Sequence, residues 1–558
     1  MSKLNRREFL KVLGQGSVAI GVGMGFSGRL SDRIGSAWAA DAQVQQAGDT
    51  WDWDAWEFYY PGKYDAADAK MLNEYKAELD RINNRGEINV KDLVSGKLNG
   101  VPGVGGGGPG AGKVTYDGMI EMAVQCGLGD DPLFTDRDYA KKTKYGDLFA
   151  VPLFSSLEIM PAMPKSGAGL GDYMVVNDLC HTMNYYKPFY EGDTLAVVTD
   201  GQYFEETTPA AGSHYRTFVM KGWGRVFNQK GELVAEGASM TNESFRRHKD
   251  PAKRNKSGAH AWESPDWWTR KPYTYTDKDY ETMKGLWKNE KSRGATPLYW
   301  DDVKIGDEPT PTVTGPVVAS GAGELMDKLS QMVLDTKKNI MDPKIFAKME
   351  KNEQGIYVLP ESMRKKTDMA GRMGGPPGGG DMPPGGMEGG GPPPGDMPPD
   401  GMGFNASEPD LNQQIKNTDG RQLFWNVMAH RWIAGLLYNW MGDQGWLQRI
   451  GRDMMDLPPG ASKAVNYQAS PTFIPSIPQR CYPDLFDKFP YLEKVPYMKG
   501  KRATWHGMSG DTAISRAYVF DKYAKNGEYF ADLVWWIETL NNYLILEGFA
   551  TVKLPKKA

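Results

Sequence analysis

The chain has 558 residues, of which 40% are hydrophobic and 24% charged, a composition typical of a globular protein with two to four domains. The formal net charge of −4 provides no basic field, so nucleic acid is excluded as an expected partner. Three cysteines, Cys126, Cys180 and Cys481, lie far apart without a C-x-x-C pair, which excludes a disulfide framework as the basis of the fold.

The first forty residues have the three parts of a removable export signal. Arg6 and Arg7 precede a Phe-Leu pair, a weakly apolar stretch covers residues 12–26, and Ala37 and Ala39 are the small residues of a cleavage site. The paired arginines indicate the twin-arginine pathway, with its translocase as the partner during export and the periplasm as the destination. An anchor helix would need about 20 predominantly apolar residues, more than this stretch supplies.

Two low-complexity segments, at 101–113 and about 370–404, are rich in Gly and Pro and are expected to be exposed loops or disordered. The run from Gly107 to Lys113 has most of a phosphate-binding loop. Because Val114 takes the place of the required Ser or Thr and no buried strand precedes it, we exclude a nucleotide site. The methionines of the second segment suit either Cu(I), a soft ion, or a flexible spacer, and we favour the spacer.

A repeat follows in chain order. Each half has a Gly-Asp-Thr turn, at 192–194 and 510–512, then strands rich in β-branched and aromatic residues, a polar turn and a last strand. A helical segment precedes each strand block, at 150–160 in the first half and at 423–442 in the second, where the apolar positions follow helical spacing. A helix followed by antiparallel strands, present twice, predicts an α+β protein in which curved sheets wrap helices.

At these residues the chain resembles the MaoC-like acyl dehydratases, in the double-hotdog arrangement related to R-specific enoyl-CoA hydratases. The resemblance covers about 115–555 without the second low-complexity segment, and several stretches carry it: 129–146, 188–193, 228–232, 299–308, 315–316, 439–447 and 548–555. It implies two hotdog domains, each an antiparallel sheet wrapped around a central helix. We expect the signal peptide at 1–39 and an extension at 40–114. The first hotdog domain is expected at 115–250, a connecting segment at 251–297, and the second hotdog domain at 298–558.

The resemblance also implies reversible addition of water to a double bond conjugated to a carbonyl. In such enzymes an Asp and a His of a Gly-Asp-x-Asn-Pro-[Ile/Leu]-His loop act on one water molecule as base and acid. Here the loop lacks the Asn before Pro132, and Phe134 takes the place of the His. The carboxylate carries over to Asp130 or Asp131, and no Asp-x-x-x-x-His pattern is present in the second half.

Of the six histidines, His430 lies in the long helix of the second half and is either a packed core residue or the acid partner of the carboxylate. The predicted catalytic set is therefore Asp130, Asp131 and His430. Phe134, His181 and Trp432 are the predicted substrate contacts. Asp443 follows the long helix, where we expect it to cap a turn over 444–452.

No His or Cys spacing suits a metal, so we expect no metal site and no cofactor. Coenzyme A thioesters belong to the cytoplasm, so an exported relative is expected to act on a free unsaturated carbonyl compound. Two alternatives stay open: a hotdog shell without chemistry that supports an exported redox partner, and an interaction protein that uses the segment 370–403. A homo-oligomer is compatible with each of them.

Overall fold

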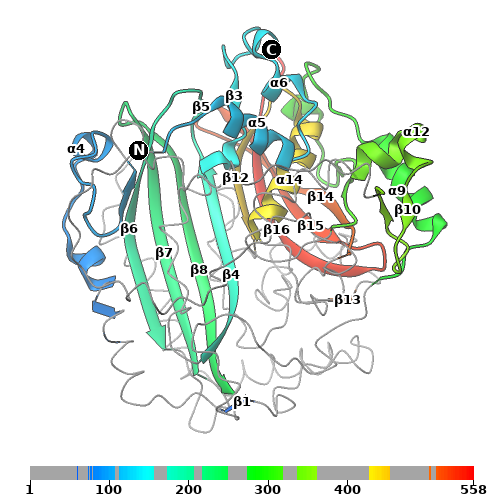
Figure 1. Cartoon of the computed structure of the whole chain (residues 1–558). Coiled ribbons are helices and arrows are strands. Elements are labelled where there is room, and N and C mark those ends of the chain that lie inside the picture. The colour runs from blue at the N-terminus through cyan, green and yellow to red at the C-terminus, as the bar shows by residue number, and fades with distance from the viewer. Residues whose placement is uncertain are drawn as a thin grey trace, which may run out of the picture.

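Two curved groups of antiparallel strands run side by side in this computed structural model, with helices packed on one face and at both edges (Figure 1). The described residues are 59–60, 73, 76–77, 79–106, 112–155, 173–206, 216–248, 273–317, 336–360, 426–452, 502–503 and 510–558. Predictions for the signal peptide and for the segment 370–404 lie outside these residues.

The first lobe has five main antiparallel strands, and the two-residue β1 (Tyr59–Tyr60) also pairs with one of them, β8. Its strands are β2 (Val104–Gly106), β4 (Tyr173–Tyr185), β6 (Leu195–Glu206), β7 (Arg216–Asn228) and β8 (Leu233–His248). Their spatial order is β2-β6-β7-β8-β4, so the second strand along the chain closes the sheet beside the fifth.

The second lobe repeats this arrangement. Its strands are β9 (Thr312–Thr314), β12 (Trp446–Arg452), β14 (Ala513–Lys525), β15 (Glu528–Glu538) and β16 (Tyr543–Leu554). From its edge the order is β9-β14-β15-β16-β12, the same as in the first lobe. The predicted duplication is therefore confirmed.

The two lobes meet through their second strands. β12 pairs with β4 in antiparallel fashion, with Arg449 opposite Asn184 and Ile450 opposite Met183, so the lobes share one continuous sheet. The Gly-Asp-Thr turns lie where they were predicted, directly before β6 and β14, and their glycines Gly192 and Gly510 have positive φ, which glycine adopts readily.

The inner face of the sheet packs on α14 (Asn426–Met441), which confirms the long helix predicted over 423–442. Ile433 and Leu437 of α14 join the same core as Leu533 and Trp535 of β15. The chain is thus an α+β protein with two hotdog domains, in which the long helix belongs to the second lobe.

The first-lobe helix predicted at 150–160 differs from the structure. Residues 149–150 form β3 (Phe149–Ala150), which pairs with β5 (Phe189–Tyr190), and a 3₁₀ helix, η1 (Pro152–Ser155), follows. Pairing with β5 fixes the backbone of Ala150 in an extended conformation, which overrides its helical propensity. Residues 156–160 lie outside the described part.

The glycine-rich segment 101–113 also departs from prediction, since Val104–Gly106 forms the edge strand β2 against Ala196–Val198 of β6. Strand pairing uses backbone groups, so glycines can take part where a neighbouring strand supplies the partners. A short helix, α4 (Val90–Val94), packs beside this edge on the outer face through Leu93.

The opposite edge of the sheet is closed by α9 (Asp277–Asn289). Trp287 donates its indole N–H to the carbonyl of Val313 at 3.0 Å, and Glu290 accepts the N–H of Val313 at 2.7 Å. These side chains take the hydrogen bonds that a further strand would form on β9, which removes an open edge.

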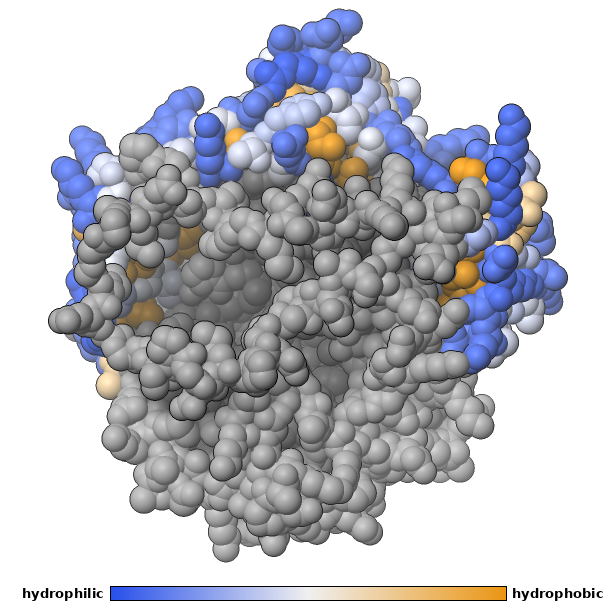
Figure 2. All heavy atoms as spheres, viewed as in Figure 1, coloured by the Kyte–Doolittle hydropathy of each residue, from blue (hydrophilic) through white to orange (hydrophobic). Residues whose placement is uncertain are grey.

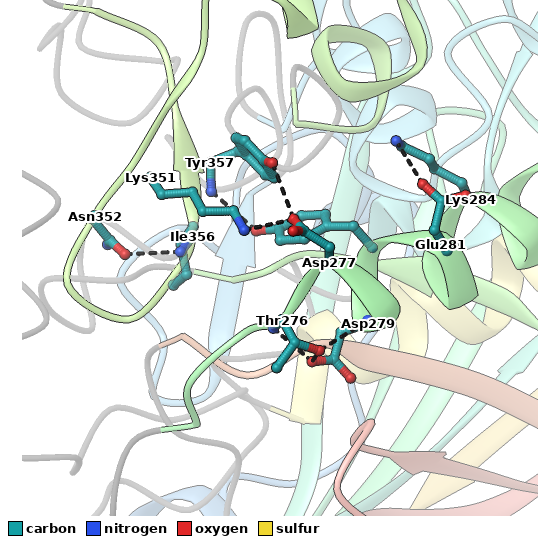
Figure 3. Close-up of polar contacts among 10 residues, drawn as sticks. Thr276, Asp277, Asp279, Glu281, Lys284, Lys351, Asn352, Ile356 and Tyr357 are labelled. Carbon is teal, nitrogen blue, oxygen red and sulfur yellow. Dashed lines mark hydrogen bonds and ion pairs between the residues drawn. The ribbon is translucent and has the colours of Figure 1, made fainter.

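Polar contacts fix the start of α9, as Figure 3 shows. Thr276 and Asp279 form a capping box, and Asp277 binds Lys351 at 2.6 Å and the Tyr357 hydroxyl at 3.3 Å. Both partners of Asp277 belong to the small hairpin of β10 (Glu350–Lys351) and β11 (Tyr357–Val358), beside α12 (Pro343–Phe346).

The described surface seen in Figure 2 is mostly hydrophilic, with small hydrophobic groups. Within the described residues, no helix has the length and apolar character needed to cross a bilayer. The remaining described elements are short: β1 (Tyr59–Tyr60), α5 (Tyr116–Gln125), α6 (Pro132–Thr135), α7 (Arg137–Ala140), η4 (Trp300–Asp302) and β13 (Arg502–Ala503).

Candidate functional site

A partly buried polar cluster lies where the loop 129–146 of the first lobe meets the C-terminal end of α14. We call Asp131, Tyr139, Ser292 and Asp443 the junction cluster. Asp131 caps α6: one carboxylate oxygen accepts the N–H of Leu133 at 3.0 Å, and the other accepts the Ser292 hydroxyl at 3.0 Å. The first lobe and the segment that follows α9 are thereby joined.

Asp443 is the deepest member of the junction cluster, with 2% of its surface exposed. Its Oδ2 accepts the hydroxyl of Tyr139 at 2.5 Å, and its backbone N–H donates to the carbonyl of Gly294 at 3.0 Å. In the described part of the chain, the hydrogen bonds of the Asp443 carboxyl use Oδ2, which leaves Oδ1 for a further partner.

The backbone places Asp443 by ending α14 sharply. Gly442 has a φ of +67° and donates its N–H to the carbonyl of Tyr438, so it terminates the helix in the left-handed conformation. A β-carbon at Gly442 would lie 2.7 Å from the carbonyl oxygen of Gly294, so only glycine permits this approach.

Cationic side chains satisfy carbonyl groups at and just beyond the end of α14. Arg293 Nε donates to Trp440 O at 2.8 Å, and Lys144 Nζ donates to Gln444 O at 2.7 Å. The Tyr145 hydroxyl donates to Gly445 O at 2.7 Å. Cations are favourable at the C-terminal end of a helix, where they complement the helix dipole.

Burial raises the pKa of the Asp443 carboxyl above its ordinary value. The hydrogen bond from Tyr139 opposes this rise, and the nearby Asp131 carboxyl adds to it. The hydrogen bond to Asp443, followed by burial, raises the pKa of Tyr139 to about 12. The cluster therefore contains a carboxyl of raised pKa beside a neutral phenol, a combination suited to proton transfer.

The predicted loop residues lie apart from one another. Asp130 is at the surface, with 84% of its side chain exposed, and it pairs with Lys338 at 3.4 Å. Phe134, at the position of the family's histidine, is buried between Phe149 and Tyr438, with ring centroids 5.2 and 4.9 Å away. Phe134 thus packs between the first lobe and α14, and its predicted contact with substrate stays a prediction.

His430 is buried on α14, and its ring packs edge-on against Trp535 of β15 at 5.7 Å. Eleven residues separate His430 from Met441 at the end of α14, or about 16 Å at the rise of a helix. His430 therefore lies far along the helix from the end where the loop 129–146 meets α14, and the structure does not bring it together with Asp131. The core packing of α14 decides where its histidine lies, and its catalytic role stays a prediction.

Trp432 is also buried in the core around α14, and its predicted contact with substrate stays a prediction. His181 lies on β4, opposite Ser239 of β8, and its side chain is outside the described part. Its predicted contact with substrate stays a prediction. In the described residues, no three His, Cys, Asp or Glu side chains are arranged to hold a metal ion.

Sequence reasoning missed the junction cluster because it assigned Asp443 to cap a turn at 444–452. Residues 446–452 form β12, and Asp443 instead accepts the Tyr139 hydroxyl. A signal did exist: the segments 139–146 and 439–446 both carry the resemblance, and in the structure they contact each other through Tyr139 and Tyr145.

No protein-family model matches this sequence, and no curated protein matches it. Among solved structures, a MaoC domain protein dehydratase of Chloroflexus aurantiacus is similar, at 12% identity over 82% of this chain and 95% of that chain, with a TM-score of 0.35. A MaoC-like dehydratase of Phytophthora capsici has 11% identity over 84% of this chain and 100% of that chain, with a TM-score of 0.32.

A third structure is a conserved hypothetical protein of Mycobacterium tuberculosis with a double hotdog fold. It has 10% identity over 81% of this chain and 95% of that chain, and its TM-score is 0.36. Neighbours of the chain are thus MaoC-like dehydratases and double-hotdog proteins. The fold assignment itself rests on the repeated strand order and on the sheet packed around α14.

Proposed function

We propose that the chain is a hydratase or dehydratase of the MaoC-like type in which Asp443, with Tyr139, replaces the Asp–His pair as the proton-transfer group. One observation supports this proposal above the others: a buried carboxyl of raised pKa is hydrogen-bonded to a phenol at 2.5 Å at the junction of the two lobes. Such groups are frequent in active sites because proton transfer at neutral pH needs them.

In the direction of hydration, the ionised Asp443 takes a proton from water while the water oxygen bonds to the β-carbon of the substrate. The electron pair of the carbon–carbon double bond moves onto the carbonyl, which becomes an enolate. The protonated Asp443 then returns its proton to the α-carbon, and the carbonyl re-forms. Atoms and charge balance within this cycle. Tyr139 holds Oδ2 by its hydrogen bond, and we assign the proton transfer to Oδ1.

The proposed substrate is a free small molecule with a double bond conjugated to a carbonyl, without coenzyme A. The twin-arginine pattern of residues 1–39 supports this choice, because an exported enzyme does not meet cytoplasmic thioesters. The location in the periplasm and the translocase as export partner are parts of the same proposal.

The test uses the purified full chain with a panel of unsaturated acids, aldehydes and ketones, and monitors loss of the conjugated chromophore. We expect turnover by the wild type and a loss of about 10²–10⁴-fold in Asp443→Asn, since this is the usual contribution of a proton-transfer group. Asp130→Asn is the matched control, because its exposed side chain lies outside the junction cluster. Equal activity of Asp443→Asn and the wild type would contradict the proposal.

A second function is favoured by the position of Phe134. In the resemblance, this ring takes the place of the catalytic histidine, and it is buried against Tyr438. The fold therefore suits a catalytically inactive hotdog protein that supports an exported redox subunit. Pull-down with the chain from its native host distinguishes the two functions. A stoichiometric redox subunit together with inertness across the panel would establish the accessory role.

A further inference from the structure

A row of polar side chains crosses the outer face of the shared sheet, opposite to α14. The side chain of Asp532 identifies this face. Its neighbours Ala531 and Leu533 on β15 lie in the core with α14, so Asp532 points to the other face of the sheet. Strand register continues the row across both lobes, and we call it the transverse row: Asp200, Arg225, Glu236, Asn184, Arg449, Thr551, Asp532 and Asp521.

In the first lobe the transverse row alternates in charge. Asp200, at the bulge of β6, binds Arg225 of β7 through two hydrogen bonds of 2.6 Å each. Such a bidentate pair compensates a carboxylate that is mostly withdrawn from water. At the junction of the lobes, Arg449 Nε donates to Asn184 Oδ1 at 2.5 Å.

In the second lobe the transverse row holds two acids. Asp532 of β15 lies directly opposite Asp521 of β14. Side chains directly opposite each other on one face have β-carbons about 5 Å apart, and like charges at that distance destabilise a sheet. Asp532 is fully buried, which makes a second negative charge there still more costly.

Burial and the opposite acid favour the neutral form of Asp532, whereas the hydroxyl and guanidinium groups that face it favour the ionised form. Thr551 of β16 donates its hydroxyl to Oδ1 at 2.8 Å, and Tyr523 of β14 also faces the carboxyl. Burial raises the pKa of Asp532 well above its ordinary value; Thr551, Arg449 and Tyr523 oppose the rise and Asp521 adds to it. Burial likewise raises the pKa of Asp521. Lys553 of β16, the next cation on this face, is paired with Glu528.

We propose that Asp532, buried opposite Asp521, keeps its proton at neutral pH, and that loss of this proton at alkaline pH weakens the pairing of β14 with β15. The second lobe thus contains a pH-sensitive element on its outer face, where the described first lobe has the ion pair of Asp200 and Arg225. Because β14 and β15 enclose α14, the element controls the stability of the sheet around that helix.

The direction of the pH dependence follows from the raised pKa values. The stability contributed by protonated Asp532 beside Asp521 is complete below the ordinary pKa of an aspartate. It is lost as the pH rises through the raised pKa values of the folded state.

The test measures the thermal midpoint Tm of the full chain from acid to alkaline pH, for the wild type, Asp532→Asn and Asp521→Asn. We expect the Tm of the wild type to fall by about 2 °C or more across the alkaline range, and each variant to lose most of this fall. Asp302→Asn, at the surface beside Lys557, is the control and should keep the pH dependence of the wild type.

A direct measurement on the wild type does not depend on the folding of a variant. Infrared difference spectra with carbon-13-labelled aspartate should show a protonated carboxyl band at neutral pH that disappears at alkaline pH. Absence of that band at neutral pH would overturn the proposal, as would a pH dependence of Tm that is unchanged in both variants.

Discussion

The two lobes of this protein have the same strand order but different polar side chains on the outer face of the sheet. In the first lobe Arg225 binds Asp200, whereas in the second lobe Asp532 lies opposite another acid, Asp521. The comparison teaches that backbone pairing and the apolar inner face specify the duplicated fold, whereas the outer face tolerates an ion pair in one copy and a carboxyl pair in the other.

The helices differ between the lobes as well. The second lobe has the long buried helix α14, whereas the described part of the corresponding first-lobe segment contains β3 and η1. α14 also contacts the first lobe, since Gly435 lies against the carbonyl of Cys126 at the end of α5. One helix therefore ties both lobes together, and the lobes are expected to unfold as one unit.

The contact at Gly435 gives the largest expected effect on stability. A β-carbon there would lie 1.9 Å from the backbone oxygen of Cys126, so Gly435→Ala should lower the free energy of unfolding by about 3 kcal/mol. Gly285→Ala is the control, because Gly285 is exposed on α9 with nothing within 4 Å of a β-carbon, and it should stabilise slightly. Denaturant unfolding measures both, and equal effects would show that α14 does not hold the lobes together.

Loss of the first-lobe ion pair between Arg225 and Asp200 should have a smaller effect on stability. Arg225→Met leaves the Asp200 carboxylate without its bidentate partner in a site that is mostly shielded from water, and should cost about 1–2 kcal/mol. Lys557→Met removes an exposed pair with Asp302 and should change stability by less than about 0.5 kcal/mol. If Arg225→Met lowered the free energy of unfolding no more than Lys557→Met does, the ion pair would not distinguish the outer face of the first lobe from that of the second.

The smallest difference in stability is expected between variants of the two neighbouring loop acids, Asp130 and Asp131. Asp131→Ala removes the cap of α6 and the bond to Ser292, with an expected cost of about 1 kcal/mol. Asp130→Ala changes an exposed side chain and should have an effect within about 0.5 kcal/mol. Thermal unfolding of the two variants side by side checks this order, and the reverse order would contradict the placement of Asp131 in the junction cluster.

Much of the fold was predictable from sequence. The turns before β6 and β14 depend on local residues such as Gly192 and Gly510, and the apolar spacing of 424–440 specifies α14. These signals are local, so one sequence is enough to find them. The strand at Val104–Gly106 was missed because its hydrogen bonds come from β6, distant in sequence.

The site was less predictable because side chains from distant segments make it. The bond between Tyr139 and Asp443 joins residues 304 positions apart, and neither residue type indicates its partner. His430 was a candidate because histidine can transfer protons at neutral pH, but the packing of α14 places its ring against Trp535. Resemblance indicated which segments matter, whereas the three-dimensional arrangement decided which of their side chains meet.

The central claim is that Asp443 transfers the proton and that the hydrogen bond from Tyr139 lowers the pKa that burial has raised. The most direct measurement is the pH dependence of kcat/KM for hydration in the wild type and in Tyr139→Phe. The Tyr139 hydrogen bond lowers the pKa of Asp443, so its removal should raise that pKa and move the acidic limb of the profile to higher pH. An acidic limb that stays in place in Tyr139→Phe would contradict the assignment of Asp443 as the base.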